Sequence, residues 1–266
     1  MKRTILTFGL AMAAGLLSAE VKVSAVGLQV TGKGYQVEGE DAHSGLRPFN
    51  WTEGTRVSLL FESDGNNIIS LDEDAAKITL FSDDKETNFL EVESRFSGRA
   101  YNFEFMTISS DGKALITTLA TEGLPKKGAG KIMVEGEVTV KTGSKSKVEK
   151  SKKVPVKKGA KVVIGEHTFE IEEFGKPKWG DYPFEIKLKS KVNHKDFKGF
   201  IFWDEKGKKV ESKQNGSSSF GLFGKRTYTV NFQMKRKVKQ LTLGLDSWTD
   251  AKNEKVPFKL ELGAGL

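Results

Sequence analysis

Apolar and polar residues alternate through much of the second half of the chain. Tyr228, Val230, Phe232 and Met234 are separated by threonine, asparagine and glutamine. This period of two places apolar side chains on one face of a strand and polar side chains on the other, as a half-buried antiparallel sheet requires. The same pattern predicts strands at residues 169–171, 184–188, 241–245 and 256–262.

The first half shows the same pattern less cleanly. Strands are predicted at residues 21–30, 57–61, 78–81, 101–108, 114–119 and 131–140, with turn signals such as Asp64-Gly65 and Gly143-Ser144 between them. A helical turn is indicated only at residues 72–77. Many short strands with regular turns favour an all-β protein, which we interpret as two tandem Ig-like antiparallel β-sandwich domains. "Ig-like" describes the architecture only, because the chain has no cysteine.

A weak internal repeat supports two domains. Pro48, Trp51 and the strand at 57–61 resemble Pro177, Trp179 and the strand at 184–188. Residues 81–85 resemble 202–206, and residues 101–106 resemble 228–234, in the same order and spaced by 121 to 128 residues. Duplication explains these matches, although short strands also resemble one another by chance.

The predicted boundary falls in a lysine-rich stretch between Thr142 and Lys161. Residues 148–156 are expected to form the outer arm of a hairpin with residues 131–141, where lysines would protect an exposed edge strand. An extended linker is the alternative. The expected domains are residues 20–159 and 160–266. Pro257 cannot donate a ladder hydrogen bond, so the last strand is expected at a sheet edge, or with that nitrogen facing solvent.

The first 19 residues have the pattern of a secretory signal peptide. Lys2 and Arg3 precede an uncharged apolar run at residues 5–17, and Ser18-Ala19 gives a small-residue cleavage site before Glu20. A buried N-terminal helix is the alternative, but the run has no polar face. We therefore expect an exported protein of the periplasm or the exterior, held together by packing without disulfides.

Charge is distributed unevenly along the mature chain. Residues 20–142 contain 13 Lys and Arg against 20 Asp and Glu, whereas residues 143–266 contain 28 against 15. An asymmetry of this size concerns partners rather than fold. It is consistent with binding to an anionic polysaccharide or membrane surface, and with head-to-tail self-association. Export makes nucleic acid an unexpected partner.

Several motifs resemble a family of uncharacterised exported bacterial β-rich proteins with no known activity. They include Lys176-Pro177-Lys178-Trp179-Gly180-Asp181, Trp248-Thr249-Asp250, Val256-Pro257-Phe258 and Asp111-Gly112-Lys113-Ala114. Because these are turn and strand residues, the resemblance implies export and β architecture and transfers no functional residue.

Motifs for catalysis and metal binding are weak. His43, His167 and His194 are far apart in the sequence, and no nucleophile motif stands in a suitable context. Asp72-Glu73-Asp74 and Asp83-Asp84 do not complete a calcium loop. Among 35 acidic residues the sequence nominates no pair for glycoside hydrolysis. We predict no catalytic residue, no metal and no cofactor.

Aromatic and basic residues give the only candidate binding sites. Trp51 and Trp179 stand in proline-containing loops and Trp248 follows a strand, positions from which indoles either cap a core or stack on sugars. A basic cluster is formed by Lys225, Arg226, Lys235, Arg236, Lys237 and Lys239. It reads either as an anion-binding face or as a plain solubilising surface.

These observations favour a non-catalytic exported protein with a binding or structural role, for which anionic surfaces or glycans are the expected ligands. The alternative is a carbohydrate-active β-sandwich enzyme or carbohydrate-binding module. Exposed tryptophans in a cleft with two facing carboxylates would favour the alternative, whereas buried tryptophans under an evenly charged surface would favour the first interpretation.

Overall fold

The computed structural model describes residues 21–32, 53–92, 98–222 and 225–263. The predicted signal peptide and Trp51 lie outside these residues. Strands dominate the described chain, and its helical segments are two 3-10 turns, η2 (Phe89–Glu91) and η3 (His194–Asp196). Neither turn has the length or apolar character needed to cross a membrane. The prediction of an all-β fold of antiparallel sheets is confirmed.

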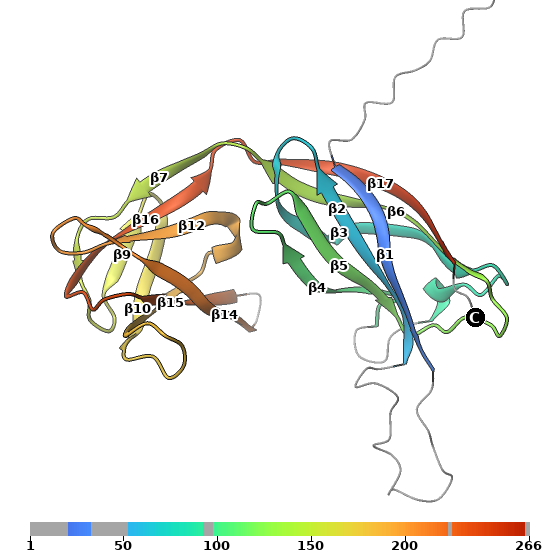
Figure 1. The fold of residues 1–266 in the computed structure, drawn as a ribbon, viewed down its shortest axis with the longest axis horizontal. Helices are drawn as coiled ribbons and strands as arrows, with labels where there is room; N and C mark the ends of the chain where they lie inside the picture. Colours follow the sequence, from blue (N-terminus) through green and yellow to red (C-terminus); the bar gives the residue numbers. More distant parts are fainter. Residues whose placement is uncertain (1–20, 33–52, 93–97, 223–224, 264–266) are drawn as a thin grey trace, which may run out of the picture.

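Two sheets enclose the first hydrophobic core (Figure 1). Their orders are β1-β2-β5-β4 and β17-β6-β3. Inward side chains such as Phe61, Phe81, Phe89 and Leu115 are fully buried. The strands are β1 (Val21–Thr31), β2 (Gly54–Ser63), β3 (Asn67–Asp83), β4 (Asn102–Ile108), β5 (Ala114–Thr121), β6 (Lys131–Gly143) and β17 (Lys252–Gly263).

Two further sheets enclose a second core, whose largest buried residues include Phe169, Ile171, Ile186 and Phe202. Their orders are β14-β15-β11-β10-β9 and β13-β12-β16-β7, and β8 also pairs with β16. The strands are β7 (Ser146–Lys150), β8 (Val154–Pro155), β9 (Lys161–Ile164), β10 (His167–Gly175), β11 (Phe184–Ser190), β12 (Phe197–Trp203), β13 (Lys209–Val210), β14 (Ser212–Leu222), β15 (Lys225–Met234) and β16 (Gln240–Trp248).

The second unit is inserted between β6 and β17 of the first unit, which corrects the predicted boundary at residues 159 and 160. β7 pairs with β16 of the second core, not with β6 as the predicted hairpin required. β17 returns to pair with β6 over its whole length and buries Val256 and Phe258 in the first core. The first unit is therefore 21–143 with 252–263, and the second unit is 144–250. As predicted, the strand containing Pro257 lies at a sheet edge.

A continuous antiparallel ribbon joins the two units. β6 leads into β7 and β16 leads into β17, so the two connections run side by side (Figure 1). The carboxylate of Asp250 accepts hydrogen bonds from the backbone N–H groups of Ser144 at 2.9 Å and Lys145 at 2.8 Å, and from the Ser144 hydroxyl at 2.6 Å. Gly143-Ser144, predicted as a turn, instead lies in the connection between the two units.

Apart from its additional strands β8, β9 and β13, the second unit repeats the strand order of the first. β10-β11-β15-β14 and β12-β16-β7 repeat the orders β1-β2-β5-β4 and β3-β6-β17. The match between residues 81–85 and 202–206 falls on the ends of the equivalent strands β3 and β12, and the strand parts of the first match, 57–61 and 184–188, fall on the equivalent strands β2 and β11. Pro48 and Trp51 of that first match lie outside the described residues. The third match is wrong, because residues 101–106 enter edge strand β4 whereas residues 228–234 belong to inner strand β15.

The predicted helical turn at residues 72–77 is also wrong. This segment lies within β3, where Asp72 pairs with Thr139 and Lys77 pairs with Glu137. Five steps along β3 thus match two along β6, so the intervening residues bulge out of the ladder. The Asp72 carboxylate accepts the N–H groups of Asp74 and Ala75, each at 3.2 Å, which closes the bulge locally without a helix.

Candidate functional site

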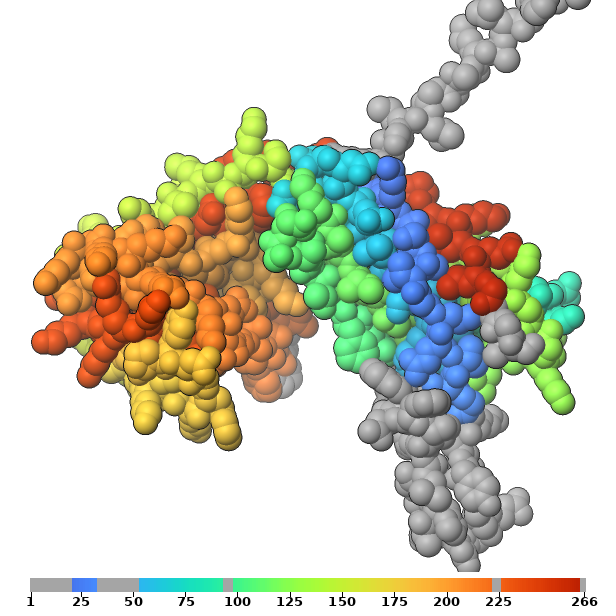
Figure 2. Space-filling model, in the orientation of Figure 1, coloured from blue at the N-terminus to red at the C-terminus, as the bar shows by residue number. Residues whose placement is uncertain are grey.

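Four segments of the second unit meet at the end remote from the ribbon. β10 ends and β11 begins at this end, and so do β15 and β16, because β16 reaches the ribbon only at Trp248. β8 pairs with Gln240 and Leu241 and so brings residues 151–158 to the same end. We call residues 151–158, 176–183, 204–211 and 235–239 the distal end. Residues 204–211 and 235–239 project at the left of the second unit in Figure 2.

The distal end concentrates the positive charge of the chain. The second unit has 25 Lys and Arg against 13 Asp and Glu, and the distal end alone has 13 against 4. Its exposed lysines include Lys176, Lys178, Lys237 and Lys239. Such a density of like charge raises the local concentration of anions.

Ion pairs hold the distal loops together. Arg236 contacts the Asp204 carboxylate at 2.6 Å, and Lys235 contacts Glu211 at 2.9 Å. The Tyr182 hydroxyl donates to Glu211 at 2.6 Å. Hydrogen bonds from Tyr182 and Lys235 lower the pKa of Glu211 below its usual range. Lys235 and Arg236 therefore brace the loops, and the exposed lysines are better placed to meet an anion.

Trp179 stands out of this surface on a fixed backbone. Its side chain is 82% exposed. Gln233, which is fully buried on β15, donates an amide hydrogen bond to the Trp179 carbonyl. Gly180 has a φ of +99° and packs directly on the Gln233 amide, where a Cβ atom would clash. The loop is thus pinned from below while the indole remains available to a ligand.

The other predicted site residues lie elsewhere. Trp248 is half-buried beside the ribbon, with the Lys198 ammonium 5.4 Å from its ring centroid. Lys225 and Arg226 begin β15, at the opposite end of that strand from Lys235. The predicted basic cluster is therefore divided, whereas Trp179 and residues 235–239 are brought together.

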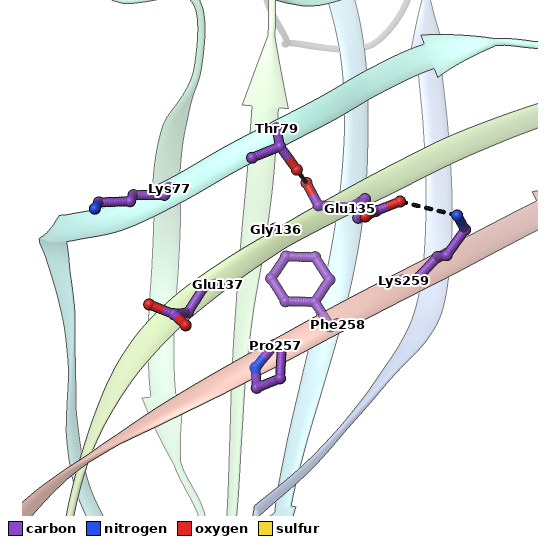
Figure 3. A pocket seen from close by; sticks show the side chains of 8 residues that line it. All are labelled: Lys77, Thr79, Glu135, Gly136, Glu137, Pro257, Phe258 and Lys259. Carbon is purple, nitrogen blue, oxygen red and sulfur yellow. Dashed lines mark hydrogen bonds and ion pairs between the residues drawn. The ribbon is translucent and has the colours of Figure 1, made fainter.

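An open hollow of about 560 Å³ lies on the first unit (Figure 3). It lies over Gly136 and Phe258, between Lys77 and Thr79 of β3 and Pro257 of β17. Its two carboxylates are both in ion pairs, Glu135 with Lys259 at 3.0 Å and Glu137 with Lys255 at 3.1 Å. Each of these carboxylates thus has a lysine partner on the neighbouring strand β17.

Metal chemistry has no preformed site in the described part of the chain, where no three His, Asp or Glu side chains gather closely enough to hold an ion. Comparison with known proteins gives no assignment either: no family model, no curated protein and no solved structure matches this chain. A functional proposal therefore rests on the geometry and charge of the distal end.

Sequence reasoning missed the supporting residues of the distal end. Tyr182, Glu211 and Gln233 are individually ordinary in the sequence and acquire their roles by packing. The alternation on β15 places Gln233 on the outward face with Asn231, so its burial could not be predicted from the sequence. In the structure Gln233 is fully buried. Only the fold of residues 176–183 over that strand explains its burial.

Proposed function

We propose that this protein is a non-catalytic exported binding protein that holds polyanions at the distal end of its second unit. The observation that supports this proposal is that the four adjoining segments of the distal end contain 13 basic residues and only 4 acidic ones. Two of those four carboxylates, in Asp204 and Glu211, are already paired within the surface. Lysines act mainly as point charges, so the affinity should be modest and weakly selective.

We also infer that each unit is an Ig-like sandwich. A strand order with four strands in one sheet and three in the other, as in β1-β2-β5-β4 facing β17-β6-β3, matches the constant-type immunoglobulin arrangement. Loops at one end of such a sandwich are a common place for binding residues, because a rigid scaffold holds them while their sequences vary freely.

The test compares two triple variants of the full chain on an acidic polysaccharide and on vesicles containing anionic lipid. Changing Lys178, Lys237 and Lys239 to Gln should weaken binding on the order of ten- to a hundredfold, since a lysine near an anionic surface contributes about 1 kcal/mol. Changing the exposed Lys191, Lys195 and Arg226 to Gln removes the same charge outside the distal end and should have a much smaller effect.

Salt provides the second readout. The Debye length is about 8 Å at physiological ionic strength, so binding should weaken steeply as salt rises. Equal losses in the two triple variants would show that only net charge matters. Binding unaffected by salt, or undetectable at low salt, would reject the proposal.

A carbohydrate-binding role is the second candidate, and exposed Trp179 favours it. An indole that is 82% exposed offers a flat apolar face to a sugar ring. Trp179→Ala should then abolish binding to a neutral polysaccharide and leave binding to anionic vesicles largely unchanged. If the wild-type protein binds no neutral polysaccharide, this second role fails and the polyanion proposal is untouched.

A further inference from the structure

Most edge strands among the described sheets carry a feature that prevents further strand pairing. β13, β9 and β7 are only 2, 4 and 5 residues long. β1 and β4 have register shifts, and Phe105 in β4 has a φ of +56°. β3 is interrupted by three register shifts, and β17 contains Pro257 among lysines. Short, bulged or charged edges of this kind protect sheets against unwanted pairing.

β14 is different. It has 11 residues, and among the described strands it pairs with β15 alone. After one register shift between Gln214 and Gly216, it runs without interruption to Leu222. Residues 216–222, Gly-Ser-Ser-Ser-Phe-Gly-Leu, contain neither charge nor proline. Phe220 on this edge is 68% exposed.

We propose that β14 is a dimerisation edge, which pairs antiparallel with β14 of a second copy of this chain. A two-fold axis perpendicular to the sheet keeps each residue on its own face, so the axis must pass through a residue position. With Ser218 on the axis, Phe220 of each copy lies opposite Gly216 of the other. A large aromatic ring across from a glycine on an edge strand is a favourable cross-strand pair.

The same register leaves no charges opposite one another within residues 216–220, beyond the register shift at Gln214 and Gly216. Ser217 faces Ser219 and Phe220 faces Gly216, so only hydroxyl and apolar groups meet there. The two five-stranded sheets would join into one continuous sheet across the axis. The second unit has 25 basic against 13 acidic residues, so repulsion between copies opposes this dimer. Salt should therefore strengthen self-association, whereas it weakens binding to polyanions.

Sedimentation equilibrium of the full chain at low and high salt tests the dimer. The wild type should form dimers that increase with salt. Ser218→Lys places two like charges on the axis and should reduce the association constant at least tenfold. Gln240→Lys adds the same charge to an exposed site of the same unit and should have little effect. A wild type that stays monomeric at high salt, or equal losses in both variants, overturns the proposal.

The absence of cysteine allows an independent test of the register. Under mild oxidation Ser218→Cys should form a disulfide-linked dimer rapidly, because the two Cβ atoms of a directly opposed pair lie about 4.5–5.5 Å apart. Gln214→Cys should not do so, because position 214 lies four residues from the axis and the two copies of this position are therefore far apart. Equal rates for the two variants would rule out the two-fold pairing through Ser218. This test is independent of anion binding, so either proposal can fail alone.

Discussion

Asp83 and Asp204 show the similarity of the two units at the level of single residues. Both are buried at the end of a strand. Each carboxylate accepts the N–H groups of the residues two and four positions later, at 2.9 and 2.8 Å for Asp83 and at 3.0 and 2.8 Å for Asp204. One oxygen thus closes a whole turn in each unit, within the segments 81–85 and 202–206 that the internal repeat matched.

Asp83→Asn tests the importance of this turn. Burial raises the pKa of Asp83, but hydrogen bonds from the backbone N–H groups of Thr87 and Lys126 outweigh it, and the net pKa is lowered. A lowered pKa stabilises the fold above the ordinary aspartate pKa of about 4, and this contribution is lost as pH falls below that value. At pH 7 the variant should lose roughly 1.5–3 kcal/mol of unfolding free energy in urea.

The difference in unfolding free energy between wild type and Asp83→Asn should become smaller in acid, because the wild-type carboxylate then loses its charge by protonation. Asp196→Asn, at an exposed position, is the control. A loss of stability that is the same at pH 3 and pH 7 would contradict a role for the charged form.

Gly136 marks a close approach of two strands under the hollow in Figure 3. A Cβ atom at this position would lie 2.5 Å from the backbone oxygen of Lys77 and 3.1 Å from Ile78. Gly136→Ala should therefore force the strands apart and lower the unfolding free energy by about 1–3 kcal/mol. Gly263→Ala, in the same sheet with open space around it, should be nearly neutral in thermal unfolding. Equal effects in the two variants would show that the sheet yields without strain.

Among the elements, strands were predictable and their partners were not. Alternation at Phe184, Ile186 and Leu188 identified β11, because side chains in a half-buried strand must alternate between core and solvent. The same rule cannot choose a partner. Residues 148–156 were assigned to the nearest strand in sequence, whereas β7 pairs with β16, more than 90 residues away.

The candidate site was predictable to the same extent. Trp179 and residues 235–239 were each recognised from the sequence, but only the fold brings them to one end. Lys225 and Lys235 were grouped because they are close in sequence. β15 has 10 residues, so an extended strand separates its ends by roughly 30 Å. Proximity in sequence therefore misled the prediction wherever a strand intervened.

The placement of β7 in the second unit and of β17 in the first predicts which fragments of the chain fold on their own. Residues 144–250 contain every strand of the second unit and should unfold cooperatively on their own. Residues 20–143 lack β17, and with it Val256 and Phe258 of the core, so they should be unstable. Joining residue 143 to residue 251 through a short Asn-Gly turn should restore that unit, because Thr142 and Lys252 are already paired.

Urea unfolding followed by circular dichroism distinguishes this inserted arrangement from a simple tandem of residues 20–159 and 160–266. Cooperative folding of both 20–159 and 160–266 would show that each unit can be completed by its own neighbouring strand. Failure of the joined first unit to fold would show that it depends on the second unit for more than β17.

The whole molecule has opposite charges on its two units. The first unit, counted from Glu20, has 16 Lys and Arg against 22 Asp and Glu, and the second has 25 against 13. The ribbon holds these units together through backbone pairing and the Asp250 carboxylate, whose pKa is lowered to about 2 by hydrogen bonds from Ser144 and Lys145. This link stays ionised across the pH range in which the basic end is proposed to bind its ligand.

The insertion of the second unit between β6 and β17 also sets the order in which the strands are synthesised. β17 leaves the ribosome after the whole second unit, about 110 residues later than β6. At 5–20 residues per second, the open edge of β6 waits roughly 5–20 s for its partner. During that interval β7 is the nearest competing strand, so a nascent chain that forms the local hairpin must undo it before maturing. The unit made first is therefore completed last, and until β17 arrives the β6 edge stays open to other strands.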